Sequence, residues 1–164
     1  MTRSTLTFFA LAGLLFLLVL WYGMRPTTTT PPNTIPAAEV AFSELVKGDQ
    51  SEVTRRENYL ITSHAEMQAL WELLGTSRPM PTIDFDKNQV IAVFAGERPS
   101  AGHVITVTKV ADSALRMVAI QIATPGPSCS AAQVVTTPYQ VLLLPKTTLT
   151  LTHQDTATTT SCWQ

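Results

Sequence analysis

The sequence predicts an α+β fold that is mostly β: an antiparallel sheet, or a small sandwich or barrel, with one packed helix and a preceding N-terminal transmembrane helix. Three observations predict the folded part. Residues 90–95 are apolar at every position, which indicates a strand buried on both faces. Residues 63–75 carry the spacing and end signals of one amphipathic helix. The chain beyond them is typical of short strands separated by turns.

Residues 6–24 are apolar apart from Thr7 and predict a membrane-spanning helix. At about 1.5 Å per residue the segment is roughly 28 Å long, close to the thickness of a bilayer core. Trp21 and Tyr22 lie near its end, where an interfacial aromatic belt is expected. We therefore expect residues 1–24 to be an uncleaved signal anchor. The alternative is a cleaved signal peptide and a secreted domain, although the segment lacks an A-x-A cleavage pattern.

Residues 25–36 are rich in proline and threonine and predict an extended linker. Residues 37–164 then form one domain, because about 128 residues suffice for a single hydrophobic core. The expected location is the inner (cytoplasmic) membrane, crossed once, with the C-terminal domain periplasmic or extracellular. The chain has 11 Lys and Arg against 12 Asp and Glu, and no basic patch that would bind nucleic acid.

The first part of the predicted domain contains two strands and the helix. Residues 39–62 predict the two strands, with a reversal at residues 47–49. Ser63 and Glu66 form a capping box at the start of the helix, and Gly75 stops it. The apolar positions of the helix share one face, which we expect to pack on the sheet. They are Met67, Leu70, Trp71 and Leu74.

Further strands are predicted at residues 89–95, 103–110, 115–123, 133–136, 140–144 and 147–153. A hairpin at residues 111–113 joins the second and third of them. In the last strand, Leu149 and Leu151 alternate with threonines, which predicts one buried face. The short connections imply largely antiparallel pairing. The tail, residues 154–164, has no pattern that predicts structure.

Cys129 and Cys162 both lie in polar sequence of the predicted domain. A disulfide between them would close a loop of about 34 residues and stabilise the fold by roughly 3 to 4 kcal/mol. Such a bond favours an oxidising compartment. The alternative is a pair of free thiols in a reducing cytoplasm.

The residues after the 89–95 strand predict a stiff loop that is presented to a partner. Glycines there permit positive φ, a proline fixes its own φ, and an arginine often anchors an interface. A preformed loop also loses less entropy on binding. The partner-binding loop consists of Gly96, Glu97, Arg98, Pro99, Ser100, Ala101, Gly102 and His103. The alternative is a structural turn in which Arg98 pairs with a nearby carboxylate.

Thr137, Pro138 and Tyr139 form a second candidate surface. Here a proline interrupts the start of a strand next to an amphipathic tyrosine. The alternative is that Tyr139 packs on the sheet with its hydroxyl at the rim.

Short motifs follow one another along most of the predicted domain: Arg56-Glu57-Asn58, Ile61, Ser63, Leu70-Trp71, Ile83-Asp84-Phe85, Val90-Ile91, Gly96, Arg98-Pro99-Ser100, Gly102, Thr137-Pro138-Tyr139 and Pro145-Lys146. Their order and spacing resemble the C-terminal domain family of PrcB, a non-catalytic subunit of a bacterial surface protease complex. Where that family usually has two glycines and a tyrosine, this chain has Ala101, Gly102 and His103. The resemblance implies a small β-rich envelope domain that associates with a protein partner, and it implies no catalytic residue.

No catalytic or metal-binding motif accompanies these residues in the sequence. His64, His103 and His153 are scattered, and neither G-x-S-x-G nor H-E-x-x-H is present. The cysteines and histidines lack the spacing of a metal site. Asp84 and Asp86 are a pair typical of a turn. We therefore expect no enzymatic activity, no metal and no cofactor.

The leading hypothesis is a non-catalytic, membrane-anchored subunit that binds or stabilises a partner protein such as a protease. One alternative is a protease inhibitor, because residues 99–103 resemble a loop of chagasin-like cysteine-protease inhibitors. Another is a small-molecule or cell-wall binding module, which would need an aromatic-lined pocket. The oligomeric state does not follow from these patterns.

Overall fold

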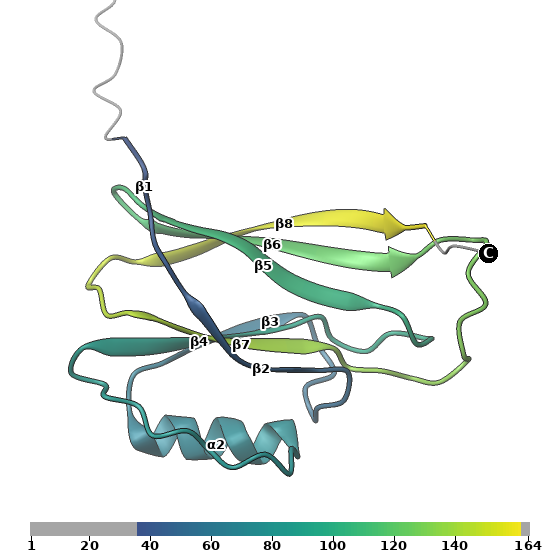
Figure 1. The fold of residues 1–164 in the computed structure, drawn as a ribbon, viewed down its shortest axis with the longest axis horizontal. Helices are drawn as coiled ribbons and strands as arrows, with labels where there is room; N and C mark the ends of the chain where they lie inside the picture. The colour runs from purple at the N-terminus through teal and green to yellow at the C-terminus, as the bar shows by residue number, and fades with distance from the viewer. Residues whose placement is uncertain (1–35, 162–164) are drawn as a thin grey trace, which may run out of the picture. The chain divides into compact units, whose positions relative to one another are not determined.

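The computed structural model describes residues 36–161, which form two four-stranded sheets and one helix (Figure 1). The helix is α2 (His64–Leu74), and the strands are β1 (Ala38–Glu39), β2 (Ser43–Gly48), β3 (Glu57–Ile61), β4 (Asn88–Phe94), β5 (Val104–Asp112), β6 (Arg116–Pro125), β7 (Tyr139–Pro145) and β8 (Leu151–Thr160). The strand orders are β1-β5-β6-β8 and β2-β7-β4-β3. The predicted mostly β fold with one helix is confirmed, in its sandwich form; the described strands do not close into a barrel.

Several predictions fall outside this part of the chain. The predicted signal anchor at residues 1–24, the linker up to residue 35 and Cys162 all lie outside the described residues. Within residues 36–161, no helix combines the length and the apolar character needed to cross a membrane.

β4 lies inside its sheet, between β7 and β3, as its apolar sequence predicts. Because side chains alternate along a strand, β4 contributes to two cores. Val90, Ala92 and Phe94 belong to the core that includes the buried residues of α2. Ile91 and Val93 belong to the core shared with β5 and β6 of the other sheet. Figure 1 shows the resulting three layers, with α2 on one face of the β2-β7-β4-β3 sheet and the second sheet on its other face.

The helix begins and ends as the sequence predicts. The Ser63 hydroxyl accepts a hydrogen bond from the Glu66 N–H at 3.3 Å, and Gly75 follows the last turn with φ 55°. The Glu66 carboxylate accepts from the Thr62 N–H at 2.6 Å, one residue before the predicted partner. Three stripe residues, Met67, Leu70 and Leu74, are buried, whereas Trp71 is half-buried.

The C-terminal strand predictions need correction. Residues 133–136 form no strand; only Thr136 makes an isolated bridge, to Arg98. The last strand is β8, so residues 154–160 of the supposedly unstructured tail are strand and residues 147–150 are not. β8 also pairs parallel with β6, against the largely antiparallel pattern of the other pairs. The sequence of β8 is polar and carries no strand pattern, because an edge strand can pair through its main chain without burying its side chains.

Polar side chains join the two sheets. Arg116, at the start of β6, is 2 % exposed and donates to both Asp112 carboxylate oxygens at 2.7 Å and to the Pro145 carbonyl of β7 at 2.6 Å. Gln140 of β7 is also buried, and its amide oxygen accepts from the Val107 N–H of β5 at 2.6 Å. These bonds satisfy buried polar groups and fix one sheet on the other.

A third link joins the two sheets near their edge strands β3 and β8. Arg56 donates from Nε and Nη2 to the two carboxylate oxygens of Asp155 on β8, at 2.8 and 2.7 Å. Its Nη1 donates to the Asn58 side chain and to main-chain carbonyls of Glu57 and Phe94. Arg56 therefore holds β8 above β3 and β4.

Candidate functional site

The loop after β4 has two glycines with positive φ and is hydrogen-bonded to a neighbouring segment. Gly96 and Gly102 have positive φ, 77° and 85°. A Cβ on Gly96 would lie 2.8 Å from main-chain atoms of Arg55 and Arg56, so glycine is required by close approach as well as by φ. Arg98 pairs with Thr136 through two main-chain hydrogen bonds of 2.7 and 2.9 Å. The loop is therefore fastened along its length to residues 132–136.

The side chains of the loop divide into an outward and an inward set. Glu97, Pro99 and Gly102 are exposed, whereas Ser100 is buried. Arg98 is half-buried, and its Nη2 donates back to the Ala95 carbonyl at 2.8 Å. Within the described residues it forms no ion pair, so the structural alternative of an Arg98–carboxylate pair is wrong. The guanidinium braces the loop from within, and the proposed interface role of Arg98 remains a prediction.

Two buried nitrogens in this loop, Arg98 Nε and His103 Nδ1, have no hydrogen-bond partner among residues 36–161. Burial lowers the pKa of His103, and the Arg98 cation lowers it further. The neutral form of His103 is therefore favoured at physiological pH.

The segment that fastens the loop adds an apolar surface that the sequence prediction missed. Val134 and Val135 are about half exposed, at 48 and 52 %. They lie between Ala132 and Thr136, which hydrogen-bond to Ala101 and Arg98 of the loop. We call the exposed residues Pro99, Val134 and Val135 the loop surface.

The second candidate surface is internal. Thr137, Pro138 and Tyr139 are all buried. The Thr137 hydroxyl accepts from the Ser51 N–H at 2.6 Å and donates to the Ser51 carbonyl at 2.7 Å, which fixes the connection after β2. Tyr139 packs in the core that faces α2, and burial raises the pKa of its hydroxyl. The three residues are therefore packed within the domain, and Pro138 also lines a hollow with His103; their role in partner binding stays a prediction.

The remaining candidates for chemistry in the sequence were the Asp84 and Asp86 pair, a metal site and Cys129. Asp84 accepts from the Asp86 N–H and pairs with Lys87 at 3.0 Å, which confirms the predicted turn. Across residues 36–161, no group of three or more His, Cys, Asp or Glu side chains could hold a metal ion. Cys129 is not a free cysteine, and its sulfur lies 3.7 Å from the Thr160 carbonyl at the end of β8.

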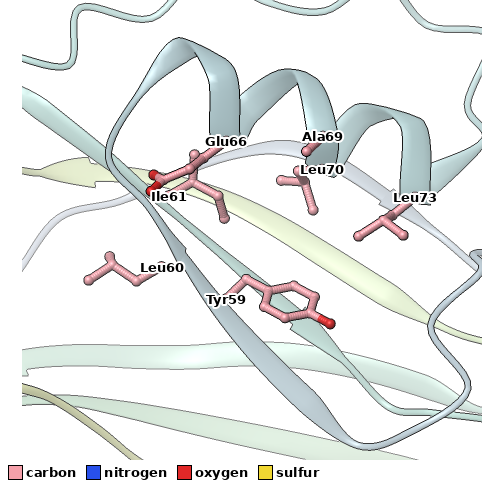
Figure 2. A pocket seen from close by; sticks show the side chains of 7 residues that line it. All are labelled: Tyr59, Leu60, Ile61, Glu66, Ala69, Leu70 and Leu73. Carbon is pink, nitrogen blue, oxygen red and sulfur yellow. The ribbon is translucent and has the colours of Figure 1, made fainter.

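A different site lies between the edge strand β3 and helix α2. It is an open groove of about 230 Å³ with a mainly apolar lining. Tyr59 and Ile61 contribute from β3, and Ala69 and Leu73 contribute from the flank of the helix (Figure 2). Leu60 also lines it and is 43 % exposed. We call this site the β3–α2 groove.

Glu66 is the charged residue in the lining of the groove. Its carboxylate accepts from the Thr62 N–H and hydroxyl, and the main-chain hydrogen bond is the largest of the causes that lower its pKa. Glu66 is therefore anionic at neutral pH. Glu57, at the start of β3, accepts a hydrogen bond from the Tyr59 hydroxyl, which raises the tyrosine pKa. Glu57 is therefore a carboxylate on β3 itself, whereas Glu66 belongs to α2 and lies beside Thr62, just after the other end of the strand.

The sequence contained a weak signal for this groove. Ala65, Ala69 and Leu73 recur at intervals of four and form a second small or apolar row beside the core stripe of the helix. The partner of that row is β3, whose edge position depends on long-range pairing. Local patterns therefore could not place the groove.

The comparisons with known proteins concern the strands around the loop. Residues 89–145 match the family model described as PrcB C-terminal. This confirms the predicted resemblance to the PrcB C-terminal family for the segment from β4 to β7. The segment contains the whole loop, Val134 and Val135, but neither β3 nor α2. No curated protein and no solved structure matches the chain.

Proposed function

We propose that this chain is a non-catalytic subunit that binds a partner protein, such as a protease, in the cell envelope. The observation that carries the proposal is the pairing of a PrcB C-terminal segment with an open apolar groove beside an edge strand. Apolar grooves with a free strand edge are a recurrent way of binding protein segments. The loop surface is a second region that a partner could contact.

The same proposal places the chain in the membrane through residues 6–24, with residues 25–36 as spacer and residues 37–164 outside the cytoplasm. A Cys129–Cys162 disulfide is part of it. Its support is that Cys129 is not free and lies beside Thr160, two residues before Cys162 in the sequence. Such a bond requires an oxidising compartment.

The size of the β3–α2 groove favours a protein segment over a small molecule as its ligand. The groove, at about 230 Å³, is smaller than the roughly 300 to 1,000 Å³ of small-molecule pockets. A side-chain-sized groove is more suited to a segment of a partner chain.

Site-specific photocrosslinking in intact cells tests the proposal. A photoreactive amino acid replaces Leu73 in the groove, Pro99 on the loop surface, or Met117 as the control. Met117 is 38 % exposed and lies on the outer face of the other sheet, because its neighbours Arg116 and Val118 are buried. We expect one defined protein to be crosslinked from Leu73, from Pro99 or from both, and not from Met117.

Absence of a defined product from both test positions would overturn the proposal. So would turnover of a substrate by the purified chain that a single substitution abolishes. Stoichiometric inhibition of a protease by the purified chain would establish the inhibitor alternative instead.

A further inference from the structure

We propose that the β3–α2 groove binds an extended segment of the partner as an added strand on β3, an inference that rests on the proposed function. The segment places an aliphatic side chain in the groove and a lysine or arginine beside Glu66. Three features of the described residues lead to this occupant: the direction of the main chain of β3, the apolar lining, and the charge at its end.

The main chain of β3 has hydrogen-bonding groups directed to the open edge. Just beyond the two ends of the β4–β7 ladder, the Ala95 N–H donates to the Pro138 carbonyl and the Lys146 N–H donates to the Lys87 carbonyl. Because hydrogen-bonded pairs alternate along an antiparallel ladder, the odd-numbered residues of β4 bond to β7 and the even-numbered ones to β3.

The register of β3 then identifies the free groups. Glu57, Tyr59 and Ile61 lie opposite Phe94, Ala92 and Val90, so they bond to β4. Asn58 and Leu60 fall between them, and their N–H and C=O groups are directed away from the sheet. A second strand can pair with these two residues without displacing any bond of the β3–β4 ladder.

The apolar lining lies where side chains of an added strand would fall. Tyr59 and Ile61 project toward α2, and in Figure 2 Ala69 and Leu73 project from the helix toward β3. Alternate residues of an added strand share this face with Tyr59 and Ile61. One such side chain enters the groove, which gives the backbone contact its sequence preference.

The negative charge of Glu66 favours a basic residue in the bound segment, next to the aliphatic side chain that enters the groove. Glu66 is anionic and lies in the lining, whereas Glu57, at the other end of β3, accepts from the Tyr59 hydroxyl and lines a separate hollow together with Arg55. A carboxylate beside an added strand attracts a cation and repels an acidic residue. The occupant is therefore an extended, basic and aliphatic segment rather than an acidic one.

A phage-displayed library of random peptides, panned against the full-length chain in detergent, provides the probe. Enriched peptides should alternate aliphatic and polar residues and carry a lysine or arginine. Their affinities are then measured for the unmodified chain and for variants whose melting temperatures show that they remain folded. Leu60→Pro removes an outward N–H and leaves the β3–β4 ladder intact, since proline is tolerated at such edge positions.

Leu60→Pro should weaken binding about tenfold, the effect of losing one well-formed main-chain hydrogen bond. Leu60→Thr keeps the N–H and should weaken binding less. Glu66→Gln keeps an acceptor for the Thr62 N–H but removes the charge, and it should cost about threefold for lysine-containing peptides. Met117→Ala, on the outer face of the other sheet, should have no effect.

Three results would overturn the inference: no enriched peptide, enriched peptides of helical or proline-rich pattern, or equal binding by Leu60→Pro and the unmodified chain. The crosslinking experiment separates this failure from that of the proposed function. A defined partner crosslinked from Pro99 but never from Leu73 would remove the groove inference and leave the subunit proposal standing.

Discussion

The two sheets differ in how much of their surface the rest of the described domain covers. The β2-β7-β4-β3 sheet has α2 on one face and the other sheet on its second face, so Val90, Ala92 and Phe94 are fully buried. The β1-β5-β6-β8 sheet is covered on its inner face, while Met117 on its outer face is 38 % exposed. The first sheet therefore buries apolar side chains on both faces, whereas the second buries them on one face, and polar links and main-chain pairing hold its edge strand β8.

β8 shows this difference most clearly. It pairs with β6 over ten residues without a register shift, yet most of its side chains are exposed. Arg56 forms an ion pair with Asp155 of β8. Arg116 of β6 donates to the Pro145 carbonyl at the end of β7 and so links the two sheets. The following substitutions test whether the two sheets depend on these different interactions.

The largest expected effect is in the doubly covered sheet. Phe94→Ala should lower the free energy of unfolding by about 3 to 5 kcal/mol, because it leaves a cavity in a fully packed core. Met117→Ala, on the outer face of the singly covered sheet, should cost less than about 1 kcal/mol. Urea denaturation followed by circular dichroism measures both. Similar losses of unfolding free energy for the two variants would contradict the proposed difference between the two sheets.

The second prediction compares two arginine–aspartate pairs that differ in exposure. Arg116→Ala removes an arginine that is 2 % exposed and should cost about 3 kcal/mol or more, because Asp112 and the Pro145 carbonyl lose their partner. Arg56 and Asp155 are 23 and 32 % exposed, so Arg56→Ala should cost about 1 kcal/mol. The same denaturation measurement applies. A larger loss for Arg56→Ala would show that the edge link is the stronger of the two.

The apolar strands of both sheets were easier to predict from sequence than the polar strand β8. β4 is apolar at nearly every position and α2 carries both of its end signals, so local patterns determine them. β8 has mostly threonine and other polar residues, and nothing local distinguishes it from a loop. Val134 and Val135 suggested a strand, but they lie on the surface beside the loop instead of within a sheet. Strand propensity does not specify a pairing partner.

In the candidate sites too, local properties could be predicted from sequence and long-range contacts could not. The glycines of the 96–103 loop predicted its positive φ values correctly, because that property is local. The inward bond of Arg98 and the burial of Thr137 depend on the segments that pack on them. The β3–α2 groove needs an edge strand and a helix in contact, which only the sheet order reveals.

The proposed disulfide gives a third test, since it would restrain the exposed end of β8. Cys129→Ala should lower the free energy of unfolding by roughly 3 kcal/mol under oxidising conditions. Dithiothreitol should lower the stability of the unmodified chain to the level of the variant and leave the variant unchanged. Equal stability of the unmodified chain with and without reductant would contradict a Cys129–Cys162 bond.

The smallest effect concerns the acid sensitivity of the two arginine–aspartate pairs. Hydrogen bonds from Arg116 and Arg56 lower the pKa of Asp112 and Asp155, so each carboxylate binds a proton more weakly in the folded state. Their stabilisation is present above the ordinary aspartate pKa of about 4 and is lost as the pH falls through the folded-state values. Glu66 and Asp84, whose pKa values are also lowered, contribute in the same direction.

Arg116→Ala should therefore flatten the loss of stability below about pH 4, measured by denaturation across pH, while Met117→Ala keeps the slope of the unmodified chain. An unchanged slope in Arg116→Ala would mean that Arg116 does not lower the pKa of Asp112 in the folded state, and that the pair acts through packing rather than charge.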